Sequence, residues 1–159
     1  SEDSGDNLVA GNDNNQGLGQ DQQEALNIHN RARAEVGVAP LVWDSDLERQ
    51  AQAYANSQVA ENGSCAMNHS SGNQRTNQGE NLATMSGSAS QAWSAQMFVD
   101  EKSLYSYGQG FSHATGHYTQ VVWSGTNSMA CAMANGPGGC GLVVCRYSPP
   151  GNWDGQNPY

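Results

Sequence analysis

The sequence predicts an α+β fold, a three-layer α-β-α sandwich in which helices cover a small antiparallel sheet. Apolar residues recur at intervals of three and four through much of the first two thirds of the chain, which is the spacing of amphipathic helices. Three short runs of strand-forming residues follow, at 118–123, 129–134 and 142–147, with glycine and proline between them. Because helices come first and hairpins last, we expect the strands to lie between helices.

Two segments divide the chain. Residues 1–20 carry four acids, no base and only three sizeable apolar side chains. Such a segment buries too little apolar surface to offset the entropy of ordering it, so we expect a flexible acidic tail. The remaining residues, 21–159, are enough for one domain with a hydrophobic core.

The first two helices are expected on either side of a short extended piece at 40–43. Asp21 is the expected N-cap of the first helix, and Gly37 ends it. Ser45 and Glu48 have the spacing of a capping box that opens the second helix, which ends at Asn62. The expected apolar faces are Ala25, Ile28, Ala32 and Val36 on the first helix and Leu47, Ala51, Tyr54, Ala55 and Val59 on the second.

A polar loop and a third helix precede the strands. Residues 62–87 are rich in Gly, Ser and Asn, and we expect a loop with a short helical turn at Gly79–Leu82. The third helix is expected from about Ser88 to Leu104. Its expected apolar face consists of Ala89, Trp93, Met97 and Leu104. The strand at 118–123 would begin directly after His117, so that the imidazole would point into a cleft at the edge of the sheet.

Charge excludes several classes of partner. Fifteen acids against six bases give a net charge of −9, and no basic stripe is visible. Such a surface repels phosphate backbones, so nucleic acid is excluded as a partner and anionic membrane surfaces are disfavoured. Neutral lipids remain open. The chain has no run approaching the roughly 18 apolar residues of a membrane span, so we expect no transmembrane anchor.

Cysteine usage and two sequons indicate secretion. The four cysteines suit two disulfides and an oxidising compartment, and the count alone allows three pairings. Four buried thiols or a zinc site is the alternative, although no Cys-x-x-Cys pair exists. Asn62 and Asn68 each begin an Asn-x-Ser triplet in a polar segment, so we expect N-glycosylation there and an extracellular location.

Several ordered motifs resemble one family. Gly116 to Trp123 reads GHYTQVVW, Cys145 to Trp153 reads CRYSPPGNW, and the pair His29-Asn30 and the run Gly79-Glu80-Asn81-Leu82 precede them. Together they resemble the CAP superfamily of cysteine-rich secretory proteins, antigen 5 and pathogenesis-related class 1 proteins, over about residues 21–159. The chain is most similar to class 1 members. The resemblance implies a CAP domain over 21–159.

The resemblance also selects a disulfide pairing. It implies that Cys65 pairs with Cys140 and that Cys131 pairs with Cys145. The first bridge would tie the loop of His69 to the sheet, and the second would join two neighbouring strands. The first closes a long loop, which restricts the unfolded chain and contributes roughly 3–5 kcal/mol.

Four positions match the central cavity tetrad of the family: His69, Glu80, Glu101 and His117. Spacing alone would not bring them together. Two imidazoles with a carboxylate can bind zinc or another divalent cation, a His–Glu pair can act on water as a general base, and the four can form a hydrogen-bonded network. The sequence leaves these three roles open.

Catalysis has less support in the sequence. The chain has no Gly-x-Ser-x-Gly elbow, and no cysteine remains as a nucleophile if all four are paired. His113 and His117 mimic the spacing of a helical metal pair, but the Glu of His-Glu-x-x-His is missing. We therefore expect His113 to be an exposed loop residue, His29 to be a hydrogen-bonded core histidine, and no residue to be assigned as catalytic.

The resemblance implies a secreted module in defence or virulence. Several similar members bind sterols or fatty acids in apolar clefts outside the tetrad cavity. Our leading hypothesis is a monomeric module that binds a sterol or fatty acid, with a His/Glu cavity able to bind a divalent metal such as zinc. A protein receptor is a further class of partner. The alternative is a metal-dependent hydrolase or protease that uses the same cavity. The residues that would contact a lipid are not identified by the sequence.

Overall fold

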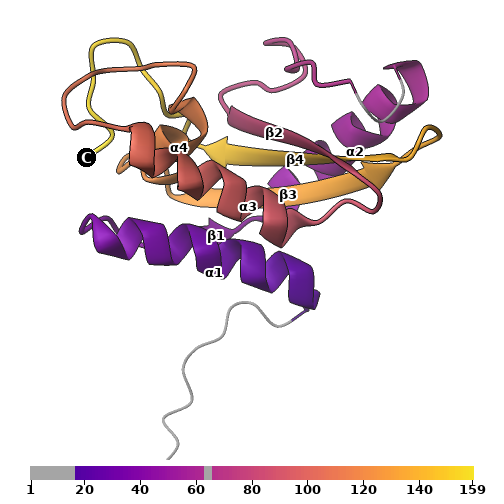
Figure 1. The fold of residues 1–159 in the computed structure, drawn as a ribbon, viewed down its shortest axis with the longest axis horizontal. Coiled ribbons are helices and arrows are strands. Elements are labelled where there is room, and N and C mark those ends of the chain that lie inside the picture. The colour runs from indigo at the N-terminus through magenta and orange to yellow at the C-terminus, as the bar shows by residue number, and fades with distance from the viewer. Residues whose placement is uncertain (1–16, 63–65) are drawn as a thin grey trace, which may run out of the picture.

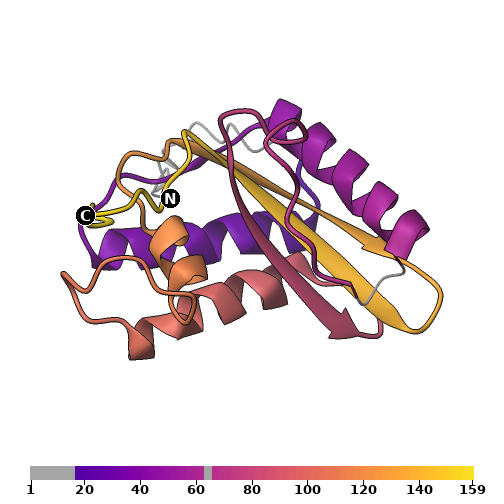
Figure 2. The same cartoon turned by 90° about the horizontal axis from the view of Figure 1, so that it is seen from above.

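The computed structural model describes residues 17–62 and 66–159 of the chain. They form three layers, with a sheet between helices on both of its faces (Figures 1 and 2), so the predicted α+β sandwich is confirmed. The predicted tail lies mostly within residues 1–16, outside the described part. The elements are α1 (Gln20–Glu35), β1 (Val42–Trp43), α2 (Ser45–Asn62), β2 (Gly79–Ser86), α3 (Gln91–Asp100), the 3₁₀ helix η1 (Glu101–Leu104), α4 (Gly116–Val121), β3 (Ser128–Asn135) and β4 (Cys140–Ser148).

The sheet has four strands in the order β1-β3-β4-β2. The long strands β3, β4 and β2 are antiparallel, with Cys131 opposite Cys145 and Glu80 opposite Arg146. β3 and β4 confirm the predicted runs 129–134 and 142–147, whereas β2 was not predicted as a strand. The short edge strand β1 pairs with β3 in parallel, which makes the sheet mixed and not wholly antiparallel. Parallel strands need a long connection, and α2, β2, α3 and α4 all lie between β1 and β3 in the chain.

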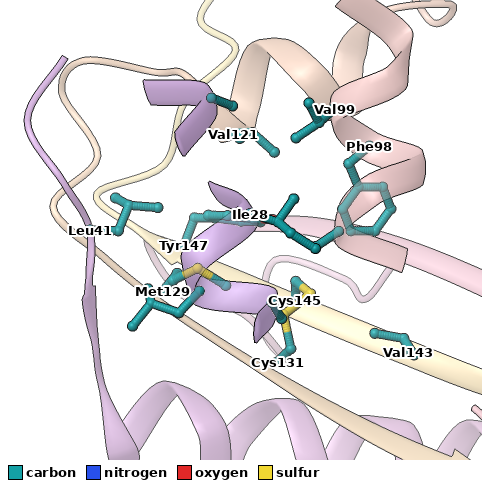
Figure 3. Close-up of a cluster of buried hydrophobic side chains, with 14 of the residues drawn as sticks. Ile28, Leu41, Phe98, Val99, Val121, Met129, Cys131, Val143, Cys145 and Tyr147 are labelled. Atoms are coloured by element: carbon teal, nitrogen blue, oxygen red, sulfur yellow. A yellow bond between two sulfur atoms is a disulfide. The ribbon is translucent and has the colours of Figure 1, made fainter. Parts of the chain in front are cut away.

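Each face of the sheet carries its own core. Side chains of a strand alternate between the two faces, so neighbouring residues belong to different clusters. Val143 and Cys145 pack toward α1, α3 and α4, whereas Leu142 and Val144 pack toward α2. Figure 3 shows the larger cluster, in which Ile28, Phe98 and Val121 meet the sheet beside the Cys131–Cys145 disulfide.

The disulfide between Cys131 and Cys145 confirms one of the two predicted pairings. It joins β3 to β4 at directly opposed positions of the ladder. The predicted partner of Cys140 is Cys65, which lies outside the described residues, so that pairing stays a prediction.

The first two helices differ from the prediction at their caps. The N-cap of α1 is Gly19, and Asp21 lies in the first turn. The Asp21 carboxylate instead accepts hydrogen bonds from the backbone N–H groups of Gln91 and Ala92 at the start of α3. At α2 the expected Ser45 capping box is absent, because Asp44 accepts from the first-turn N–H groups at 46 and 47. Sequence spacing alone did not reveal which carboxylate reaches which helix end.

The third helix turns a different face to the core than predicted. Trp93, Met97 and Leu104 were expected inside, but they are exposed by 48%, 39% and 65%. The buried face carries Ala95, Phe98 and Val99, and the helix ends at Asp100 before the 3₁₀ turn η1. None of the helices within 17–62 and 66–159 is both long and apolar enough to span a membrane.

Two local predictions were wrong in the type of element. The segment Gly79–Leu82, expected as a helical turn, begins strand β2. The segment 118–123, expected as a strand, lies mostly in the short helix α4. β-branched and aromatic residues favour strands only where a pleated surface is there to receive them. Here Tyr118, Val121 and Val122 pack into the core beside α1 and α3. His117 therefore lies in the first turn of a helix and not before a strand.

Candidate functional site

The first half of the site pairs His69, in the loop before β2, with Glu80 on β2. His69 Nδ1 lies 2.8 Å from Glu80 Oε1. The backbone N–H of Ser70 donates to the same oxygen at 2.9 Å, and the Ser70 hydroxyl donates to Oε2 at 2.6 Å. Since β2 is held on the sheet by β4, the carboxylate is a fixed point on which the loop is anchored.

Arg146 lies behind this pair, and its side chain and that of Glu80 are fully buried. Arg146 Nε is 2.8 Å from Glu80 Oε2, an ion pair whose N–H is not aligned as a hydrogen bond. The guanidinium also donates to Gln78 and lies 5.3 Å from the ring centre of Tyr54. Burial raises the pKa of Glu80, but hydrogen bonds from His69 and Ser70 and the charge of Arg146 outweigh it and hold the pKa below its usual value.

The second half pairs His117, in the first turn of α4, with Glu101, the first residue of η1. His117 Nδ1 lies 2.7 Å from Glu101 Oε2. The other carboxylate oxygen accepts the backbone N–H of Tyr118 at 3.0 Å, so Glu101 also satisfies an amide of the first turn of α4. The ring of Phe98 stacks on the His117 imidazole, with 5.0 Å between centroids and 13° between planes.

Both imidazoles are therefore held in the same way. A carboxylate is an acceptor, so Nδ1 carries the proton in each pair and the Nε2 of a neutral imidazole keeps its lone pair. No residue of the described ranges makes a hydrogen bond to either Nε2. This is the arrangement in which a carboxylate orients a histidine toward a ligand.

Three of the four predicted tetrad residues line one cavity of about 430 Å³. His69, Glu80 and His117 line it, whereas Glu101 is not among the lining residues and acts on the cavity through His117. Across the described part of the chain, no group of three or more His, Cys, Asp or Glu side chains is arranged to hold a metal ion.

Several lining residues were not assigned to the cavity from the sequence. His113 is an exposed loop residue, as predicted, but it also lines the cavity. Arg75, Phe111 and Asp154 line it too, although none belongs to a motif that pointed there. The presence of His113 four residues before His117 was the one available signal.

The carboxy-terminal segment forms one wall of the cavity. Asn152, which has a positive φ of 58°, accepts a hydrogen bond from Thr119 Oγ1 at 2.6 Å and donates to Gly116 O at 2.9 Å. Gly151 donates to Gln120 at 3.0 Å, and a Cβ at Gly151 would lie 2.6 Å from the Trp123 side chain. The two sequence motifs around 116–123 and 145–153 are therefore parts of one tightly packed unit.

The other predicted positions lie outside the cavity. His29 is a core histidine with two hydrogen bonds, to Ala25 O at 2.8 Å and to the Tyr147 hydroxyl at 2.7 Å. Asn62 and Asn68 are both exposed, and Asn68 directly precedes His69. The rest of the Asn62 sequon lies outside the described residues. Glycosylation at both stays a prediction.

Comparison with known proteins shows the family of this chain. Residues 26–147 match the model of the cysteine-rich secretory protein family (CAP). The basic form of pathogenesis-related protein 1 from Nicotiana tabacum is 42% identical over 139 residues, which cover 86% of this chain and 75% of that protein. Pathogenesis-related protein 1 from Arabidopsis thaliana is 39% identical, over 87% of this chain and 82% of that protein.

Solved structures show the same fold. A crystal structure of NaASP2 with Zn²⁺ superposes with a TM-score of 0.73 and 27% identity, covering 91% of this chain and 88% of that one. Na-ASP-1 superposes with a TM-score of 0.75 at 23% identity, covering 92% of this chain and 43% of that one. The family match and the plant relatives, together with the shared sandwich fold, show that the chain belongs to the CAP, or cysteine-rich secretory protein, family and is similar to pathogenesis-related protein 1.

Proposed function

We propose that this protein is an extracellular defence-related or virulence-related module whose cavity binds a divalent cation through His69 and His117. The observation that carries the proposal is the pair of imidazoles that share one cavity, each with Nδ1 engaged by a carboxylate. Neutral imidazole nitrogen is a good ligand for Zn²⁺ and similar ions. The plant relatives support the defence setting, and NaASP2 has been solved with Zn²⁺.

Glu80 and Glu101 would support such a cation without contacting it. Three hydrogen bonds and the Arg146 charge engage the two oxygens of Glu80, and His117 and Tyr118 engage those of Glu101. The donor set is thus two Nε2 atoms, which fits an open site completed by water or by a ligand. A bound cation would polarise whatever oxygen completes that site.

Calorimetric titration of Zn²⁺ tests the proposal. A His69→Ala, His117→Ala double variant should lose the binding signal, and Glu101→Gln should weaken affinity about 10- to 100-fold, because it removes the carboxylate that orients His117. His113→Ala is the matched control, since His113 lines the same cavity without a carboxylate partner. If the double variant binds Zn²⁺ as well as the wild type does, the cation does not bind through His69 and His117. Loss of binding in His113→Ala would then place it at His113.

Binding of a sterol or fatty acid is a second proposed activity, supported by the surface of α3. Trp93 and Met97 are one helical turn apart and both are exposed. Neutral apolar ligands are also compatible with a net charge of −9. Saturable binding of cholesterol, ergosterol or palmitate should fall in a Trp93→Ala, Met97→Ala variant. A lack of saturable binding to all three by the folded wild-type protein would contradict it.

The hydrolase alternative requires a base or nucleophile beside the cation. Glu80 and Glu101 both have their oxygens engaged, so the geometry favours binding over hydrolysis. Incubation with broad peptide and ester substrates, with and without Zn²⁺, separates the two. Zinc-dependent turnover that disappears in the double histidine variant would establish the alternative.

A further inference from the structure

Two exposed aromatic side chains lie beside the cavity. Phe111 is 45% exposed and forms part of the cavity lining. Trp153 is 55% exposed and borders a narrow crevice that shares Phe111 and Asn152 with the cavity. The aromatic surface is therefore continuous with the polar cavity, and we refer to Phe111 and Trp153 as the aromatic rim.

The aromatic rim is fixed in place before any ligand binds. Trp153 Nε1 donates to Pro150 O at 3.0 Å, which holds the indole. Phe111 packs over Gly116, where a Cβ would come within 2.8 Å of its ring, and the His113 imidazole meets the Phe111 ring edge-on, with 5.4 Å between centroids. A ligand that stacks on these rings would lose little affinity to side-chain ordering.

Charges around the cavity are balanced. Arg75 donates to Ser70 O and Gln78 O, and its Nη2 has no hydrogen-bond partner among the described residues. The Asp154 carboxylate also lines the cavity and makes no hydrogen bond within the described ranges. Deeper in the wall, Glu80 is neutralised by Arg146. The cavity thus offers a charged donor and a charged acceptor but little net charge.

We infer that the cavity and its aromatic rim bind a neutral oligosaccharide. Hydroxyl groups both donate and accept, so they can satisfy Arg75 and Asp154 together, and charge-assisted hydrogen bonds of this kind are the strong ones. The C–H face of a pyranose packs on the face of Phe111 or Trp153. An apolar ligand would cover Arg75 Nη2 and the Asp154 carboxylate without giving either a hydrogen-bond partner. A polyanionic glycan would meet Asp154 and a chain of net charge −9.

This inference goes beyond the proposed cation site and uses different side chains. Among the described residues, neither Trp153 nor Arg75 makes a hydrogen bond to His69 or His117, and the cation would occupy the Nε2 side of the imidazoles. Failure of one proposal is therefore distinguishable from failure of the other, provided that Zn²⁺ and oligosaccharide are titrated separately on the same variants.

The test is a titration of the whole chain with three neutral hexasaccharides: cellohexaose, mannohexaose and the N-acetylglucosamine hexamer. Binding of at least one should change tryptophan fluorescence and shift the amide resonances at 110–117 and 151–156. Trp153→Ala should raise the Kd for the hexasaccharide that binds about 10-fold, and Arg75→Gln should raise it about 10- to 100-fold. Trp153→Phe keeps a stacking face and should restore most of the affinity.

Trp93→Ala is the matched control, because Trp93 has a similar exposure on α3 and does not line the cavity. Its Kd should equal that of the wild type, and Zn²⁺ binding should be unchanged in Trp153→Ala. The inference is overturned if none of the hexasaccharides binds at 10 mM, or if Trp93→Ala and Trp153→Ala weaken binding equally. Polygalacturonate, a polyanionic glycan, is titrated in parallel. The inference is also overturned if polygalacturonate binds and the neutral hexamers do not, since charge would then determine binding.

Discussion

His29 is a buried titratable residue that the fold keeps neutral. Nδ1–H donates to Ala25 O, so Nε2 accepts the hydrogen bond of the Tyr147 hydroxyl. Burial lowers the pKa of His29 from 6.5 to about 4, although the bond to Ala25 opposes this. The imidazole is therefore a structural link between α1 and β4 and is not available as a ligand.

We predict that this histidine makes stability depend on pH between about 6.5 and 4. In that window the unfolded chain binds a proton that the folded protein does not, so the free energy of unfolding falls as the pH falls, by as much as roughly 3 kcal/mol. Urea unfolding at several pH values should show this slope. In His29→Gln the slope over this window should be markedly shallower, and an unchanged slope would assign it to other groups.

The buried ion pair of Glu80 and Arg146 leads to a second prediction. Glu80→Gln leaves the Arg146 charge buried without a counter-charge, so unfolding free energy should fall by about 3–5 kcal/mol. Replacing Arg146 with Gln in the same chain should cost less than the sum of the two single changes, because the partners are lost together. Additive losses in urea unfolding would show that the pair is not energetically coupled.

At the scale of elements, the helices of one layer depend on each other through Asp21. This carboxylate on α1 accepts from the Ser90 hydroxyl and from the N–H groups of Gln91 and Ala92, so a side chain of α1 caps α3. α1 and α3 also pack side by side on the sheet (Figure 2). The orientation of α3, and with it Glu101 and the site, is set partly from α1.

We therefore expect Asp21→Ala to lower the free energy of unfolding by about 1–2 kcal/mol, as the loss of a helix cap does. Asp46→Ala is the control, because Asp46 makes only an exposed ion pair with Arg49 on α2 and should change stability by less than about 0.5 kcal/mol. Equal effects of the two changes in urea unfolding would refute the cap.

At the scale of the whole molecule, the chain end closes the site. The backbone N–H of Ser124 donates to Pro158 O at 2.7 Å, the Tyr107 hydroxyl donates to Tyr159 O at 2.8 Å, and Pro158 is buried. Through Gly151, Asn152 and Asp154 the same segment lines the cavity. The body of the domain and its last eleven residues thus form one unit.

Removal of residues 149–159 should therefore disturb the site as well as stability. We expect a lower Tm, because the buried side chains of Gln120 and Thr119 lose hydrogen-bond partners. We also expect reduced affinity for Zn²⁺, because α4 and His117 lose a supporting wall. Thermal unfolding and calorimetry of the truncated chain measure both. A truncation of residues 1–17 is the control and should leave Zn²⁺ affinity unchanged, since these residues precede the family match, which begins at residue 26.

Local sequence patterns determined a large part of this molecule. The helical periodicity of α1 and α2 and the strand runs of β3 and β4 were recognisable because each of these elements packs an apolar face against the core. The motif resemblance assigned the family, the Cys131–Cys145 pairing and the residues His69, Glu80, Glu101 and His117. These features depend on residues close together in the sequence or on motifs that recur within a family.

Only the tertiary structure decided the features that depend on contacts distant in sequence. The run at 118–123 has strand-forming residues, yet it lies mostly in the helix α4, because its apolar side chains pack into the core beside α1 and α3. The prediction chose the wrong face of α3 because apolar residues occur at helical spacing on two of its faces. Trp93 and Met97 lie on the exposed one. Arg75, Phe111 and Asp154 reach the cavity from three separate loops, and loop positions follow from packing and not from periodicity.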